Sequence, residues 1–272
     1  MKTLDDHVII YDDECPMCNL YTRAFVQTKM LDENGRQAYS VMDKELQTLL
    51  DQQKACNEIA LVNTHTKSVL YGIDSLFHVL GHSFPFMKPL FRLSVVHWIS
   101  KRLYSFISYN RKVIAPAANK KNKNQCTPTL DLKYRWLYIL FVWIVTSLVL
   151  NSYSPLLLPL VPKGSFYREF AICGGQILFQ SMTVSFLRRE KLIDYLGNMM
   201  TVSLIGAVLL IPVLIIGKLG LIVNPYFYMG YFMIVVGLMI LEHMRRVKLL
   251  NIHWSATLGW IIYRLLVLTI IL

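Results

Sequence analysis

Two cysteines near the start of the chain are the residues best suited to carry out chemistry. Cys15 and Cys18 form a C-x-x-C sequence around Pro16, directly after the short apolar run 8–11. A thiolate at a helix N-terminus faces unpaired backbone N–H groups and the positive end of the helix dipole, which lower its pKa. Proline is favoured at the first position of a helix. We therefore predict a strand followed by a helix that begins at Pro16, with Cys15 as the attacking thiol and Cys18 as the resolving thiol.

Asp12 lies just before this pair, and the sequence leaves two interpretations of it open. A buried Asp12 could assist proton transfer from Cys18, whereas an aspartate at the end of a strand is also a common turn or cap residue. Asp12, Asp13 and Glu14 together place negative charge beside Cys15. We expect this charge to oppose the helix dipole and raise the pKa of the Cys15 thiol.

Metal binding is the main competing chemistry for a C-x-x-C pair. A structural zinc site needs two further ligands, and the sequence has no second C-x-x-C. We therefore predict no metal site and no bound cofactor. A soft metal such as Cu(I) can use two thiolates alone, so metal transfer stays open as a different class of function.

The residues around the pair resemble the DCC family of thiol-disulfide oxidoreductases, named for an Asp-x-x-Cys-x-x-Cys motif that here reads Asp12, Cys15 and Cys18. The segment 71–75 (YGIDS) is similar to the family's Tyr-x-Gly-x-x-Ala segment, and 104–111 (YSFISYNR) is similar to its closing Tyr-x-x-x-x-x-Asn-Arg helix. The resemblance covers about residues 7–115. It implies a thioredoxin-like α/β fold and dithiol-disulfide exchange through the two cysteines.

Two positions depart from the related patterns. The residue after Asp12 is usually glycine in the family and is Asp13 here. No proline lies between Cys18 and Pro85, so the proline that thioredoxins place opposite their cysteines is missing. Residues 57–59 would have to take that place.

Charge and hydropathy separate the chain into two unlike parts. Residues 1–110 hold 11 Lys or Arg and 12 Asp or Glu, whereas the remainder holds 17 and 5. This distribution argues against a nucleic-acid-binding face on the N-terminal part. The basic part contains five apolar stretches, each near the roughly 20 residues that span a bilayer. They are approximately 134–153, 166–187, 195–217, 225–241 and 253–272.

Basic residues are concentrated in every second loop between these stretches. Thirteen of them, at 111–135, 188–191 and 245–248, fall on one side if all five stretches cross the membrane. Lysine and arginine accumulate in cytoplasmic loops, so we predict a multi-pass membrane protein with a cytoplasmic N-terminal domain. The start of the chain is charged, and its first apolar run has only four residues, so we predict no signal peptide. A reducing compartment favours a catalytic or metal-binding C-x-x-C over a structural disulfide.

These observations predict three regions, which are a thioredoxin-like α/β domain at 1–115, a basic tether at 116–132 and an all-α transmembrane domain at 133–272. In the first we expect strands near 8–11, 38–42, 58–62 and 68–71, and helices at 16–30, 44–53 and from 73 onward.

The predicted function is that of a membrane-anchored oxidoreductase that exchanges disulfides with a protein or small-molecule thiol, with the lipid bilayer as its other partner. The alternative is a membrane carrier or receptor in which the cysteine pair senses redox state or handles a soft metal. Arg264 lies in the middle of the fifth apolar stretch, where a charge usually has a partner or a function. Glu169 is the candidate partner that we expect for it, and a ligand site between them is the competing interpretation.

Overall fold

The computed structural model describes residues 2–117, 128–222 and 224–271. The chain divides into two compact units, Met1–Tyr134 and Arg135–Leu272. Of the predicted tether, residues 118–127 lie outside the described residues. Thr129 belongs to the first unit, where its backbone N–H donates a hydrogen bond to Asn57 Oδ1 at 2.8 Å.

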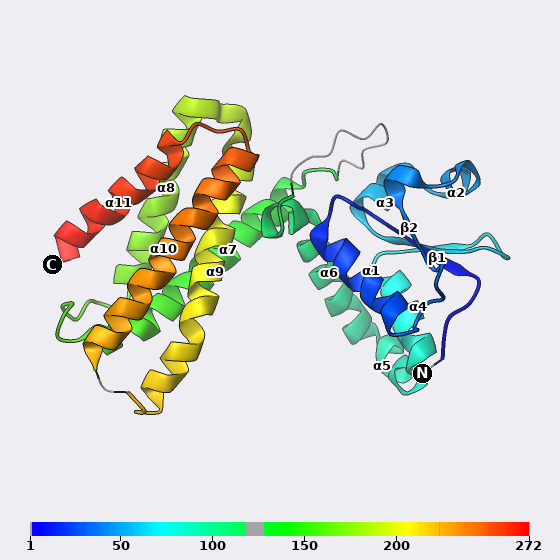
Figure 1. The fold of residues 1–272 in the computed structure, drawn as a ribbon, viewed down its shortest axis with the longest axis horizontal. Coiled ribbons are helices and arrows are strands. Elements are labelled where there is room, and N and C mark those ends of the chain that lie inside the picture. The colour runs from blue at the N-terminus through cyan, green and yellow to red at the C-terminus, as the bar shows by residue number, and fades with distance from the viewer. Residues whose placement is uncertain (1, 118–127, 223, 272) are drawn as a thin grey trace. The chain divides into compact units, whose positions relative to one another are not determined.

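The first unit is built on a four-stranded sheet with the order β2-β1-β3-β4 (Figure 1). Its strands are β1 (His7–Tyr11), β2 (Arg36–Ala38), β3 (Ala60–Asn63) and β4 (Val69–Tyr71). β1 pairs in parallel with β2 and antiparallel with β3, and β3 pairs antiparallel with β4. A parallel β-α-β unit beside an antiparallel hairpin is consistent with a thioredoxin-like fold, which confirms the predicted fold class.

The two faces of the sheet have separate cores because successive residues of a strand point to opposite sides. Ile9 lies in one cluster with Phe25 and Val79, and Ile10 lies in the other with Met42. Helices α1 (Pro16–Gln27) and α4 (Ile73–Ser83) cover the first face, and α2 (Lys44–Leu49) and α3 (Gln52–Asn57) cover the second. The pairing of Ile9 with Leu61 and of Ile10 with Ala60 keeps both cores continuous across β3.

Three details differ from the sequence prediction. The strand expected at 38–42 ends at Ala38 and continues as the 3-10 helix η1 (Tyr39–Val41). The helix expected at 44–53 is two helices, because Asp51 caps a new one by accepting a hydrogen bond from Lys54 N at 3.0 Å. Helix α1 ends at Gln27, and Lys29 then adopts a positive φ of 57°.

The unit ends in three helical segments, η2 (Pro85–Met87), α5 (Lys88–Arg92) and the long helix α6 (Ser94–Ile114). One side of α6 packs on the sheet domain, since Tyr104 contacts the core formed by Ile9 and Val79. Asn110, near the end of α6, is fully buried and donates to the backbone oxygen of Tyr134 at 3.0 Å.

The second unit is entirely helical in its described residues. Its elements are α7 (Leu132–Tyr153), η3 (Ser154–Leu157), α8 (Arg168–Arg188), η4 (Arg189–Lys191), α9 (Leu192–Lys218), α10 (Pro225–Leu249) and α11 (Ser255–Ile271), with α7 beginning three residues before the division. Three helical segments of the described chain are long and apolar enough to cross a membrane, namely Leu132–Leu157, Arg168–Lys218 and Pro225–Leu249. Ser255–Ile271 is apolar but shorter. These segments confirm a membrane-protein composition, whereas the count of five crossings stays a prediction.

The long segment Arg168–Lys218 contains α8, η4 and α9. The chain folds back at η4, so that α8 and α9 lie side by side (Figure 1), and Tyr195 on α9 donates a hydrogen bond to Gln180 on α8 at 2.8 Å. His243 on α10 joins them, with its Nε2 3.0 Å from the Tyr195 hydroxyl. Buried polar contacts of this kind hold apolar helices together where burial of apolar surface supplies little force.

The predicted pairing of Glu169 with Arg264 is wrong. Glu169 accepts a hydrogen bond from the adjacent Arg168, with Nε 2.9 Å from Oε1. Arg264 instead lies over the ring of Trp260, 5.3 Å from its centroid. A neighbour in sequence reaches Glu169 more easily than a residue on another helix, and an aromatic face on the same helix is the contact that Arg264 makes.

Candidate functional site

The cysteine pair lies at the junction between β1 and α1, as predicted. Cys15 is the N-cap residue of α1 with extended backbone angles, and Pro16 occupies the first turn. The backbone N–H of Cys18 points at Cys15 Sγ, 3.4 Å away. Both cysteines are free thiols, and each is 5% exposed. The proline and the cap geometry therefore place both thiols at the positive end of the helix, as the spacing predicts.

Asp12 is buried beside them and forms an ion pair with Arg111, which comes from the C-terminal turn of α6. Arg111 Nη2 lies 2.8 Å from Asp12 Oδ2, and both side chains are only 5% exposed. The other carboxylate oxygen of Asp12 accepts a hydrogen bond from Glu14 N at 3.0 Å. Asp12 is thus both a turn residue and a buried charge, so the two interpretations of its position are not exclusive.

Arg111 is the site residue that the sequence reasoning missed. It was counted with the basic flank of the first apolar stretch, but its guanidinium also donates to two backbone oxygens, of Cys56 at 2.7 Å and of Asn57 at 3.1 Å. Its place in the Asn-Arg pair that closes the family-like helix was the signal that could have identified it.

Residues 57–59, which we expect to take the place of the thioredoxin proline, are held by α6. Ser108 Oγ and Arg111 donate to Asn57 O, and Ile59 N donates to the Tyr104 hydroxyl at 3.0 Å. Side chains of α6 therefore satisfy backbone groups of this segment. This arrangement fixes the segment without a proline.

The electrostatics of the site differ from the sequence expectation. The hydrogen bond from the Cys18 thiol, together with the Cys18 N–H and the charge of Arg111, lowers the pKa of Cys15 from 9.0 to about 7. The hydrogen bond to Cys15 and burial raise the pKa of Cys18. The expected rise at Cys15 is wrong because the hydrogen bonds of Cys18, joined by the charge of Arg111, outweigh burial and the charge of Asp12, both of which raise the pKa of Cys15. Asp13 meanwhile accepts a hydrogen bond from Ser40 Oγ at 3.0 Å.

A thiol pKa near 7 predicts the pH dependence of alkylation. Because the thiolate is the nucleophile, the iodoacetamide rate at Cys15 should rise with pH and reach half of its plateau near pH 7. Peptide mass mapping after timed quenching follows each cysteine separately. Cys18 is the internal control, since its raised pKa predicts little reaction over the same range. A half-plateau near pH 9 at Cys15 would contradict the geometry described above.

We expect removal of the Tyr104 hydroxyl to lower the stability of the N-terminal unit measurably. Tyr104→Phe leaves Ile59 N–H without its acceptor, and a buried unsatisfied donor costs about 1–3 kcal/mol. Hydrogen exchange of β3 peptides in native buffer should show this loss. Tyr71→Phe is the matched control, because the Tyr71 hydroxyl accepts from Asp51 N at 2.9 Å at an exposed position. Equal losses in the two variants would contradict the prediction.

His78 and His82 form an H-x-x-x-H pair, a spacing that places two possible metal ligands on one helix face. His82 Nε2 lies 3.0 Å from Thr3 O, and the His78 ring packs 5.2 Å from that of His7. Among the described residues, no group of three or more His, Cys, Asp or Glu is placed to hold a metal ion. These histidines therefore make local packing and hydrogen-bond contacts.

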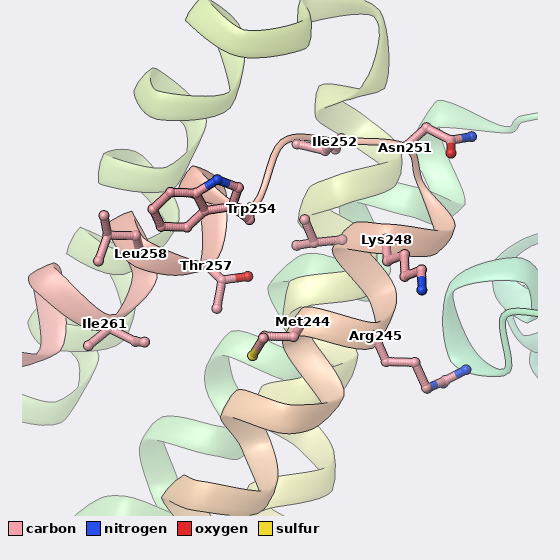
Figure 2. Close-up of a pocket in the computed structure, with 10 residues that line it drawn as sticks. Met244, Arg245, Lys248, Asn251, Ile252, Trp254, Thr257, Leu258 and Ile261 are labelled. Carbon is pink, nitrogen blue, oxygen red and sulfur yellow. The ribbon is translucent and has the colours of Figure 1, made fainter.

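A hollow of about 630 Å³ lies in the helical unit between α10 and α11 (Figure 2). Apolar side chains such as Met244, Trp254 and Leu258 line most of it, with Arg245 and Lys248 also in the lining. Neither a cysteine nor a histidine lines it. Cys15 and Cys18 both belong to the N-terminal unit.

The fold and the site define the class of the N-terminal unit, which is a thioredoxin-like dithiol domain with its thiols at a helix N-terminus. Residues 9–115 match the model of the DCC1-like thiol-disulfide oxidoreductase family, so the resemblance is confirmed for this part of the chain. No curated protein and no solved structure matches the chain.

Proposed function

We propose that the protein is a membrane-anchored thiol-disulfide oxidoreductase whose N-terminal unit faces the cytoplasm. The observation that carries the proposal is the unequal pair of thiols at the start of α1, with the pKa of Cys15 lowered to about 7 and that of Cys18 raised. One thiolate is ready to attack at neutral pH while its neighbour keeps its proton. The family match over residues 9–115 supports the same chemistry.

The exchange runs in two steps. Cys15 thiolate attacks one sulfur of a substrate disulfide, forms a mixed disulfide, and releases the other substrate sulfur as a thiolate. Cys18 then loses its proton and attacks Cys15 Sγ, which closes the Cys15–Cys18 disulfide and releases the second substrate thiolate. The substrate gains two electrons and the protein loses two. A reducing compartment favours this reductase direction.

Arg111 and Asp12 have different parts in these steps. Arg111 is a positioning residue whose charge stabilises the thiolate of Cys15 and whose hydrogen bonds hold the backbone at Asn57. Asp12, buried in the same site, is proposed to accept the proton of Cys18 during the second step. That proton transfer requires Asp12 to keep its charge, and the ion pair to Arg111 supports this.

Orientation rests on the distribution of basic residues. The structure describes ten of the thirteen cations on the proposed cytoplasmic side, and three of these ten are buried in polar contacts, namely Arg111 with Asp12, Arg135 near Asp194, and Arg246 with Glu242. The others remain as the positive-inside signal. We keep the cytoplasmic assignment on that basis.

A redox titration of the full chain in lipid nanodiscs tests the proposal. The protein is equilibrated in glutathione buffers, quenched with acid, alkylated, and mapped by mass at Cys15 and Cys18. A reversible two-electron transition of this pair is the expected result. A pair that never bridges, or that bridges only after a copurified soft metal has been removed, would contradict the oxidoreductase and favour metal handling.

A further inference from the structure

The described surface of the first unit carries an unusual concentration of apolar side chains on one side. Among residues 2–84, the large hydrophobic side chains that are strongly exposed are Leu20, Val41 and Leu70. The next segment, 85–107, exposes many more, including Phe86, Leu90, Val95, Trp98, Ile99 and Leu103. Phe86 is 79% exposed and Trp98 is 61% exposed. These six residues define the α5–α6 face.

This face follows from the helical period of α6. Val95, Ile99 and Leu103 recur every four residues and therefore form one stripe along the helix. Tyr104, Ser108 and Arg111 lie on the opposite stripe, which packs onto the sheet domain and the cysteine site. The inner stripe explains why α6 belongs to the fold. The outer stripe has no such structural role, and exposed apolar patches of this kind mark interaction sites.

The charge of the same segment indicates what it contacts. Residues 75–114 contain six Lys or Arg and no Asp or Glu, whereas residues 1–74 contain seven and twelve. All six cations are on α5 and α6, four of them being Lys88, Arg92, Lys101 and Arg102, and the Arg102 guanidinium lies 5.9 Å from the Trp98 ring centroid. The unit is thus electrically polarised, with its positive side coinciding with its exposed apolar side.

An anionic partner therefore fits the α5–α6 face better than a basic one. Residues 135–272 of the same chain hold eleven Lys or Arg and four Asp or Glu, so charge opposes docking of the helical unit on this face. A second copy of the face is basic as well. The inner leaflet of a membrane is anionic. Apolar helices of this chain that enter a membrane would bring such a surface close to the first unit.

We propose that the α5–α6 face lies in the interface of an anionic bilayer, with Trp98 and its apolar neighbours among the lipid headgroups and Arg92, Lys101 and Arg102 on the lipid phosphates. Tryptophan at headgroup depth and basic residues beside an apolar stripe are the composition of interfacial helices. The acidic side of the unit then faces away from the membrane. This inference depends on no cysteine chemistry, and it rests on the proposed cytoplasmic orientation of the first unit.

Site-directed photocrosslinking in the full chain tests the inference. The photoreactive amino acid p-benzoylphenylalanine is introduced at position 98, and separately at position 41 as the control, in nanodiscs of phosphatidylglycerol and phosphatidylcholine. Val41 is 71% exposed in the same unit but lies in η1, next to the core of the opposite sheet face. Mass analysis of the products identifies whether each probe has reacted with lipid or with protein.

Lipid adducts several-fold more abundant at position 98 than at position 41 are expected. In the triple variant Arg92→Gln, Lys101→Gln and Arg102→Gln, the equilibrium constant for docking on the bilayer should fall by about fivefold per cation, which is equivalent to about 1 kcal/mol each. Adducts at position 98 with residues of the same chain or of a second copy would overturn the inference, as would equal lipid labelling at both positions. Hydrogen exchange of residues 88–107 in the wild-type chain is the second measurement, since phosphatidylglycerol should slow it relative to phosphatidylcholine if the face is docked.

Discussion

Replacement of Cys15 by serine is expected to reduce disulfide exchange to the uncatalysed rate, whereas replacement of Cys18 by serine should allow the first attack and stop the second step. Cys15→Ser removes the thiolate whose pKa is lowered to about 7, and no other described group at the start of α1 is a comparable nucleophile. Cys18→Ser removes the resolving thiol, so the mixed disulfide at Cys15 accumulates. The measurement is turnover of a model disulfide, with intact mass of the quenched protein to detect the adduct.

Cys173→Ser is the matched control for both cysteine variants. Cys173 is a free, buried thiol on α8, a helix of the second unit, so its loss should leave turnover unchanged. Turnover retained in Cys15→Ser but lost in Cys173→Ser would contradict the assignment of the reactive pair. A mixed disulfide that accumulates in Cys15→Ser and not in Cys18→Ser would reverse the order of attack.

Local rules were enough to predict the position of the two thiols. The apolar run before Cys15, the proline at Pro16 and the three-residue spacing to Cys18 all act within one strand and one helical turn. The β3–β4 hairpin follows from its short connection at 64–68, and the parallel pairing of β1 with β2 could be expected from the resemblance. Errors in this part are errors of boundaries, as at Ala38 and Asp51, where a 3-10 turn and a helix cap interrupt the expected element.

Long-range contacts account for what the sequence could not predict. Asp12 and Arg111 are 99 residues apart, so no periodic pattern shows that they form an ion pair. Counting neighbours along the chain gave Cys15 three nearby carboxylates and a raised pKa. The folded site instead adds the Arg111 charge and the Cys18 hydrogen bonds, and it turns Asp13 toward Ser40. The sign of the pKa shift therefore follows mainly from the hydrogen bonds of Cys18, which a count of neighbouring charges omits, and Arg111 from a distant helix adds to it.

The helical unit shows the same limit. Hydropathy located four of the five apolar stretches to within a few residues, because this signal is a local average, whereas α10 continues to Leu249, well beyond the predicted end at 241. Partners of buried polar residues were not predictable, since Tyr195, Gln180 and His243 come from three helices. The pairing proposed for Arg264 failed for this reason.

The second large effect is expected at the buried ion pair between Arg111 and Asp12. Arg111→Met removes one partner of a buried pair and leaves the carboxylate of Asp12 without a counter-charge, which costs about 3–5 kcal/mol of stability. The variant also loses the hydrogen bonds to Asn57 O and Cys56 O. Native-state hydrogen exchange of β1 and β3 peptides measures the loss. The double variant with Asp12→Asn should recover part of it, because no unpaired charge then remains.

A loss of stability alone would not distinguish an ion pair that only holds the fold from one that also tunes the reactivity of the thiols. The pKa of Cys15 does distinguish these two roles. Arg111 lowers this pKa and Asp12 raises it. Arg111→Met should therefore shift the pH profile of Cys15 alkylation upward and Asp12→Asn should shift it downward, although both variants are less stable. If Asp12 accepts the Cys18 proton, Asp12→Asn should also slow resolution of the mixed disulfide while its formation at Cys15 stays as fast or faster. Shifts of the same sign in both variants would show that the pair acts only by holding the fold, whereas opposite shifts with slow resolution assign a charge-balancing role to Arg111 and a proton-transfer role to Asp12.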